Sequence, residues 1–239
     1  MRNILTIAGK EIRSYFGSPM AYVVTAVFLV MTGYFFADSL GGRFAQANIR
    51  GFLLIPAPYI LVVLAPLLSM RLFAEEAKMG TLELLLTAPV RDYHVVIGKY
   101  LASVVVLASM IGLTIYYPIL LMLLGFTPDL GPVVSGYVGL FLLGMAFLSV
   151  GIFTSSLTNN QIVAAVLTVG ILLLLTVFYF GSTYLLGISA DIIGYLAWFP
   201  HFRDFAFGII DTKDVIYFVS IAAAFLLFTV QSVSARRWR

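Results

Sequence analysis

RLFAEEAKMGTLELLLTAPVRDYH, residues 71–94, is a charged stretch between two long apolar segments. Only 10% of the 239 residues are charged, whereas 62% are hydrophobic. A loop that merely joined two membrane helices would not need Glu75, Glu76, Lys78 and Glu83 next to an apolar run of leucines. The pattern therefore indicates a docking element that faces water on one side of a membrane.

The composition excludes an ordinary soluble domain, because the chain combines long apolar runs with 20 Phe and 13 Tyr residues. A helix that crosses a bilayer needs about 20 mostly apolar residues. Six segments meet this requirement, and we expect them to be the membrane spans: 19–37, 53–72, 95–124, 133–157, 161–180 and 215–233. The sequence predicts an all-α polytopic membrane protein in which residues 1–239 form one membrane domain.

The basic residues predict how this domain is oriented. With six spans, both termini and the segments 71–94 and 158–160 lie on one side of the membrane. That side holds ten of the 14 Lys and Arg residues, and the other side holds four. Since cytoplasmic loops are enriched in Lys and Arg, we expect both termini in the cytoplasm. The overall charge of +3 then reflects topology, and we expect the lipid bilayer, not a nucleic acid, as a partner.

The residues before the first span predict an amphipathic helix. At 100° per residue one arc is apolar, and it comprises Ile4, Leu5, Ala8, Ile12, Tyr15 and Phe16. The opposite arc is polar and basic. A helix of this kind lies in the plane of the membrane interface. Gly17, Ser18 and Pro19 would then turn the chain into the first span.

The charged stretch itself predicts a short cytoplasmic helix over residues 74–86. Acidic side chains are favourable in its first turn, and Thr81 can cap a second segment after a break at Gly80. A leucine edge rimmed by carboxylates favours a protein partner, although a helix lying on lipid is the alternative. The predicted docking residues are Glu75, Glu76, Lys78, Gly80, Thr81, Leu82, Glu83, Leu85 and Leu86.

Residues 73–102, FAEEAKMGTLELLLTAPVRDYHVVIGKYLA, resemble the permease subunits of type-2 ABC transporters. Those subunits typically read E-E-x-x-x-G-T-L-E-L-L-L-x-x-P, followed by G-K where the third span opens. SSLTNNQIVAA (155–165) and FPHFRDFAFGIIDTKDVIYF (199–218) extend the resemblance along the chain. The last segment resembles permeases of the gliding-motility and nitrous-oxide-reductase accessory type.

The resemblance implies a transporter with two permeases and two separate cytoplasmic ATPase subunits. The charged stretch would be its coupling helix, which inserts into a cleft of the ATPase. The second permease is either another copy or a paralogue, and an outer-face accessory protein is a further candidate partner. We therefore expect a permease in the bacterial inner membrane, either an exporter or a mechanotransmitter. ATP and Mg would bind to the partner, and this chain would need no cofactor.

The motifs of ATP chemistry are missing from the sequence. A phosphate-binding loop reads G-x-x-x-x-G-K-[ST], and the Gly-Lys pairs at 9–10 and 98–99 lack both the upstream glycine and the following Ser or Thr. With no Cys and only His94 and His201, the chain offers no multi-histidine or thiolate metal site. We expect this chain not to be an enzyme.

Two other functions are open to a six-span protein: an ion-coupled secondary transporter, and a membrane anchor or scaffold without transport. Secondary transporters place ionisable residues near the bilayer midplane. The predicted spans carry no Asp, Glu, His or Arg near their centres. Lys99 lies a few residues inside the third span, and we expect its ammonium to snorkel to the interface.

The segment 181–214 predicts short helices at the outer leaflet, because it is too apolar for a solvated loop and too interrupted to span. His201, Arg203 and Asp204 within it form a candidate outer gate, or simply pair with one another. We expect Asp211 and Asp214 to cap the start of the sixth span.

Small residues spaced four apart permit close contact between helices. We interpret two such pairs, Ala108 with Gly112 and Gly151 with Ser155, as internal packing.

Overall fold

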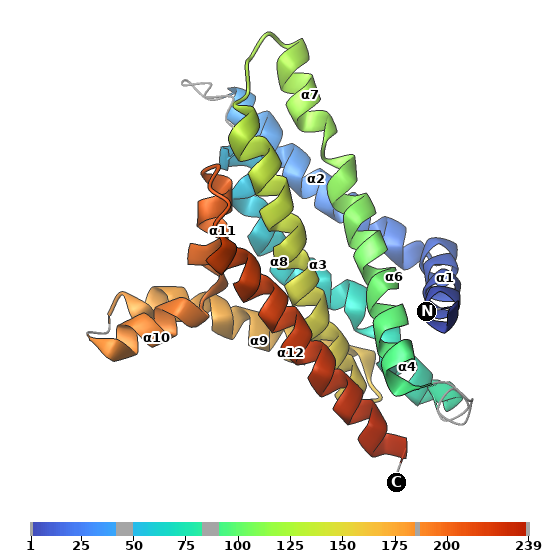
Figure 1. The fold of residues 1–239 in the computed structure, drawn as a ribbon. Helices are drawn as coiled ribbons and strands as arrows, with labels where there is room; N and C mark the ends of the chain where they lie inside the picture. The colour runs from blue at the N-terminus through green and yellow to red at the C-terminus, as the bar shows by residue number, and fades with distance from the viewer. Residues whose placement is uncertain (1, 42–49, 83–90, 185–186, 238–239) are drawn as a thin grey trace.

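A computed structural model describes residues 2–41, 50–82, 91–184 and 187–237, and every regular element among them is helical (Figure 1). The elements are α1 (Arg2–Gly17), α2 (Pro19–Gly41), the π-helix η1 (Arg50–Leu54), α3 (Pro56–Ser69), α4 (Arg71–Met79), α6 (Asp92–Leu113), α7 (Tyr116–Leu123), α8 (Leu130–Leu157), α9 (Gln161–Ser182), α10 (Ile188–Leu196), α11 (Trp198–Ala206) and α12 (Thr212–Arg237).

Six helical segments are long and apolar enough to cross a membrane, which confirms the predicted all-α polytopic fold. They are Pro19–Leu40, Pro56–Met79, Asp92–Leu123, Leu130–Leu157, Gln161–Ser182 and Thr212–Arg236. The second span reaches further than predicted, because α3 continues into α4 through a turn at Met70.

Helix α8 is the centre of the bundle and packs against α3, α6, α9, α11 and α12 (Figure 1). Its glycines allow this crowding. A Cβ added at Gly139 would lie 2.5 Å from the Cβ of Phe205 on α11, and one added at Gly144 would lie 2.6 Å from Leu107 on α6. The small face of α8 thus lets several helices approach one axis.

The turn between α3 and α4 is held by α8. Ser155 Oγ accepts hydrogen bonds from the amides of Phe73 and Ala74, both at 3.1 Å, and donates to the carbonyl of Met70 at 2.8 Å. Where one helix stops and the next begins, backbone amides and carbonyls lack hydrogen-bond partners within the helices, and Ser155 supplies them here. A Cβ at Gly151, one turn away, would lie 1.9 Å from Ser69 Oγ, so the predicted contact at Gly151 and Ser155 is confirmed.

The other small-residue pair does not pack inside the chain. Ala108 is exposed, and a Cβ added at Gly112 would meet nothing within 4 Å. Our interpretation of this pair as internal packing is therefore wrong, because the pair lies on an outward-facing side of α6.

The third span is two helices instead of the single predicted one, and α6 gives way to α7 at Thr114. Pro118 lacks the amide that would bond the Thr114 carbonyl in a continuous helix. That carbonyl instead accepts hydrogen bonds from the Tyr117 amide at 3.0 Å and from the hydroxyl of Tyr137 on α8 at 2.8 Å. On the facing side, the hydroxyls of Thr32 and Tyr117 lie 3.0 Å apart.

Helix α1 confirms the predicted N-terminal amphipathic helix. It packs on α6 at Gly98, where a Cβ would lie 2.8 Å from Cγ2 of Ile7. α1, α4 and the end of α12 gather at one end of the bundle, away from α7 and α11 (Figure 1). At this end Ser234 donates to Asp92 at 2.7 Å, so the two ends of the chain share one end of the molecule.

Candidate functional site

Helix α4 carries three of the nine predicted docking residues, Glu75, Glu76 and Lys78. It begins at Arg71, three residues earlier than predicted, and ends at Met79 because Gly80 adopts a left-handed conformation with φ of 69°. Glycine takes this conformation without steric cost, which makes it a common helix stop. Thr81 and Leu82 are helical again after this break, and the Thr81 hydroxyl donates back to the Glu76 carbonyl at 3.4 Å. Thr81 as a helix cap stays a prediction, because the amides that it would cap lie outside the described residues. Glu83, Leu85 and Leu86 lie outside the described residues.

Residues 78–81, which we call the α4 tip, are all exposed. The side chain of Met79 is 61% exposed, although it is large and apolar. The root of the helix is different, because Leu72, Phe73 and Ala74 are buried against the spans. Helix α4 thus has a short exposed tip that is apolar and basic, and a base that is packed against the spans.

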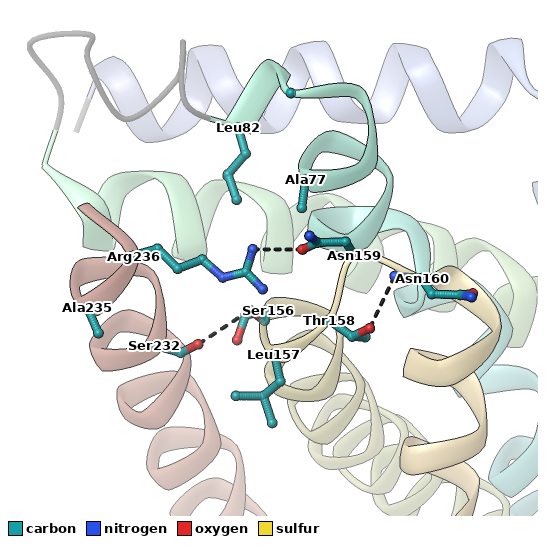
Figure 2. Close-up of a pocket in the computed structure, with 11 residues that line it drawn as sticks. Ala77, Leu82, Ser156, Leu157, Thr158, Asn159, Asn160, Ser232, Ala235 and Arg236 are labelled. Carbon is teal, nitrogen blue, oxygen red and sulfur yellow. Dashed lines mark hydrogen bonds between the residues drawn. The ribbon is translucent and has the colours of Figure 1, made fainter. Parts of the chain in front are cut away.

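A cavity of about 1060 Å³ lies on one side of α4 (Figure 2). Ala77 and Leu82 form its upper wall, and the connection between α8 and α9 faces them. Gly80 also lines the cavity. Arg236 of α12 reaches across and donates to Asn159 Oδ1 at 3.0 Å. The remaining lining residues are Ser156, Leu157, Thr158, Asn160, Ser232 and Ala235.

This cavity joins two of the sequence motifs, because residues 155–165 supply the wall that faces α4. Sequence reasoning missed the contribution of α12. In the sequence, the end of the sixth span is marked only by the basic residues Arg236, Arg237 and Arg239.

A second cavity, of about 880 Å³, lies on the other side of α4 and separates it from α1. Its lining is strongly charged, with three basic and three acidic side chains. The lining residues are Lys10, Glu11, Ser14, Gly17, Ser18, Arg71, Leu72, Glu75, Glu76, Met79, Thr81 and Lys99.

Lys99 forms a buried ionic triad with Glu11 and Glu76. Its Nζ lies 2.9 Å from Oε1 of Glu11 on α1 and 2.8 Å from Oε1 of Glu76 on α4. The lysine side chain is only 1% exposed, and the ring centroid of Phe73 lies 5.5 Å from Nζ. Our expectation that Lys99 snorkels is therefore wrong, because α1 and α4 cover it and provide the countercharge that burial requires.

The triad separates the roles of the two neighbouring glutamates. Glu76 points inward to Lys99, and its Oε2 is buried without a hydrogen-bond partner among the described residues. Glu75 lines the second cavity and is partly exposed. Of the two carboxylates, only Glu75 is therefore placed to meet a partner without first breaking an internal ion pair.

The start of α4 is tied to the turn between α1 and α2. The Arg71 guanidinium lies 4.2 Å from the ring centroid of Tyr15 and donates to Ser18 Oγ at 2.9 Å. The Tyr15 hydroxyl donates to the Leu68 carbonyl at 2.6 Å. Burial raises the pKa of Tyr15, which keeps this hydroxyl protonated and able to donate.

A sequence model described as "ABC-2 family transporter protein" matches residues 5–197 of the chain. The chain belongs to the ABC-2 family. It is therefore a multi-pass membrane protein and a permease of an ABC transporter, as the resemblance implied. The match begins in α1 and includes α4 and the connection between α8 and α9. A comparison with curated proteins gave no match.

At the other end of this ABC-2 permease, the structure does not bring His201, Arg203 and Asp204 together. His201 pairs with Asp214, whereas Asp204 lies 3.5 Å from the ammonium of Lys213. Arg203 is exposed. α10 and α11 are the short helices predicted between spans five and six.

The predicted caps of the sixth span differ from each other. Asp211 Oδ1 accepts from the Lys213 amide at 3.0 Å, as a capping residue does. This bond and the nearby ammonium lower the pKa of Asp211. Asp214, by contrast, is turned inward and is fully buried.

Proposed function

We propose that this permease works with a separate cytoplasmic ATPase subunit that docks on the α4 tip, and that it acts as an exporter or mechanotransmitter. The observation that carries the proposal is the position of α4. It projects at one end of the bundle between two polar cavities, with Met79 exposed at its tip. A partner that enters either cavity would contact α4 along its length.

The contacts at the base of α4 support a role in transmitting motion. Ser155 ties the helix to α8, Arg71 ties it to the turn before α2, and Glu76 ties it to α6 through Lys99. A displacement of α4 would therefore act on three parts of the membrane domain at once: α8, the turn before α2, and α6. ATP and Mg would bind only to the ATPase.

The complete transporter, in this proposal, contains two permeases and two ATPase subunits. Residues 1–239 form one membrane domain, and a second copy or a paralogue completes the pathway with two-fold symmetry. The expected location is the bacterial inner membrane with both termini in the cytoplasm. An outer-face accessory protein would contact α10 and α11.

Docking is tested by the double variant Glu75→Lys/Met79→Asp, co-purified with the proposed ATPase subunit. We expect the double variant to insert into the membrane normally. The amount of ATPase that co-purifies with it should fall roughly tenfold or more, because one reversed and one added charge would face the partner. Arg203→Glu, an exposed charge change at the opposite end, should retain the ATPase. Equal retention by the double variant, or transport by the permease without any ATPase, would contradict the proposal.

Orientation is tested with single cysteines, because the natural chain has none. We expect Thr127→Cys, at the exposed connection before α8, to react with a membrane-impermeant thiol reagent in intact cells. Lys78→Cys on the α4 tip should react only after the cells are permeabilised. The reverse pattern would place the α4 tip outside the cell and exclude a cytoplasmic ATPase as its partner.

A further inference from the structure

The outer end of the bundle contains a buried pair of titratable side chains that the transport proposal does not use. His201 on α11 is 5% exposed, and Asp214 in the first turn of α12 is 0% exposed. His201 Nδ1 lies 2.6 Å from Asp214 Oδ1, and His201 Nε2 lies 3.0 Å from the backbone carbonyl oxygen of Tyr195. Both ring nitrogens are therefore engaged.

These two contacts fix the number of protons that the pair must hold. A carbonyl oxygen only accepts hydrogen bonds, so His201 Nε2 must carry a proton. A contact of 2.6 Å between Nδ1 and a carboxylate oxygen requires another proton between those two atoms. A neutral imidazole has a single N–H and an ionised carboxylate has none, so the pair holds one proton more than these two ordinary forms provide.

We propose that His201 and Asp214 form a proton-binding site on the outer face, and that the bound proton latches α11 to α12. With the proton in place, an imidazolium bridges the Asp214 carboxylate and the Tyr195 carbonyl. When the proton leaves, two lone pairs face each other at one of these contacts. That loss is costly in a buried site, where water cannot replace the missing bond.

Within the described part of the chain, Asp214 is the charged side chain that contacts the His201 ring. The ring stacks on Tyr217 with centroids 3.9 Å apart and meets the ring of Tyr195 edge-on at 4.9 Å. Helices α8 and α9 carry no charged residue, and their titratable side chains are Tyr137 and Tyr179.

The other charged groups of this region lie nearer the surface. Lys213 pairs with Asp211 at 3.2 Å and with Asp204 at 3.5 Å. Arg203 on α11 and Asp191 on α10 are exposed. Asp214 Oδ2 is buried and has no hydrogen-bond partner among the described residues, so the short contact of Oδ1 with His201 Nδ1 is the side-chain hydrogen bond that the structure gives this carboxylate.

Other hydrogen bonds hold α11 on the bundle independently of the latch. α11 is also held by Ser135, whose hydroxyl donates to the Phe205 carbonyl at 2.8 Å, and by Trp198, whose Nε1 donates to Thr176 at 2.9 Å. These bonds contain no titratable group and tie α11 to α8 and α9. Loss of the proton therefore weakens the contact between α11 and α12, where the ion pair of Lys213 and Asp204 remains, while α11 stays on the bundle.

The direct test is the protonation state of His201 in the intact permease. The chain has only two histidines, so ¹⁵N-histidine labelling of the His94→Asn variant leaves His201 as the single ring observed by NMR. We expect both ring nitrogens to carry a proton at neutral pH. A ring with one protonated and one bare nitrogen would overturn the proposal, and this measurement needs no change at the site itself.

The second test is the pH dependence of thermal stability in detergent. Because the latch contributes only while the proton is bound, we expect Tm to fall by roughly 4 °C more in the natural protein than in Asp214→Asn as the pH is raised. Asp204→Asn removes a nearby carboxylate that is not part of the pair and should keep the natural profile. Identical profiles for the natural protein and Asp214→Asn would refute the latch. The test does not depend on an ATPase partner.

Discussion

Replacing Lys99 with Met is expected to lower the free energy of unfolding by up to about 3–5 kcal/mol, because Glu11 and Glu76, whose side chains are only 14% and 16% exposed, would lose their shared cation. Both carboxylates contact the same ammonium, at 2.9 and 2.8 Å. The loss should appear as a large fall in Tm of the detergent-solubilised permease. Lys10→Met changes an exposed lysine that lines the same cavity and should have little effect.

A triple variant tests whether the stability lost in Lys99→Met comes from uncompensated charge or from packing around the triad. Lys99→Met/Glu11→Gln/Glu76→Gln removes all three charges while keeping the side-chain sizes similar. Replacing a whole buried ionic group by neutral residues is often close to neutral in stability, so we expect the triple variant to be more stable than Lys99→Met. If the triple variant is no more stable, the cost lies in packing around Lys99 and not in uncompensated charge.

The triad also tests the transmission of motion without changing the proposed docking surface. The triple variant keeps Glu75 and the α4 tip, so it should still bind the ATPase while its nucleotide-driven stimulation or transport falls. This result would distinguish Glu76 from Glu75, two neighbours that sequence reasoning had treated alike.

The spans and the helix stop at Gly80 could be predicted because their causes are local. About 20 apolar residues suffice to define a span, and a glycine after an amphipathic turn is a common helix end. The burial of Lys99 could not be predicted in the same way. Its partner Glu11 lies 88 positions away, and the snorkelling expectation assumed that no other helix covers this part of the third span.

Other features had a sequence signal that was too ambiguous or was overlooked. Pro118 inside the third apolar segment marked the break between α6 and α7, although the hydroxyl of Tyr137 that satisfies it comes from another span. The partner of His201 was ambiguous because Asp204, Asp211 and Asp214 all lie within 13 positions of it. Only packing shows which carboxylate is buried.

Replacing Gly151 with Ala is expected to destabilise the permease by about 1–3 kcal/mol, the usual cost of overpacking a dense core. The new Cβ would lie 1.9 Å from Ser69 Oγ and 2.7 Å from Ser69 Cβ. Rotating the Ser69 hydroxyl removes the first clash but not the second, so α3 must move away from α8. Gly170→Ala on α9 is the matched control, since its Cβ would meet nothing within 4 Å and alanine favours a helix over glycine.

The same substitution should reach the proposed docking site, because Ser69 ends α3 directly before the turn that starts α4. A shift of α3 would pull the amides of Phe73 and Ala74 away from Ser155, which holds both at 3.1 Å. We therefore expect Gly151→Ala to lower both Tm and ATPase retention, and Ser69→Gly/Gly151→Ala to restore both by removing the clashing atoms. Loss of Tm with full ATPase retention would show that α4 keeps its place independently of the contact between α3 and α8.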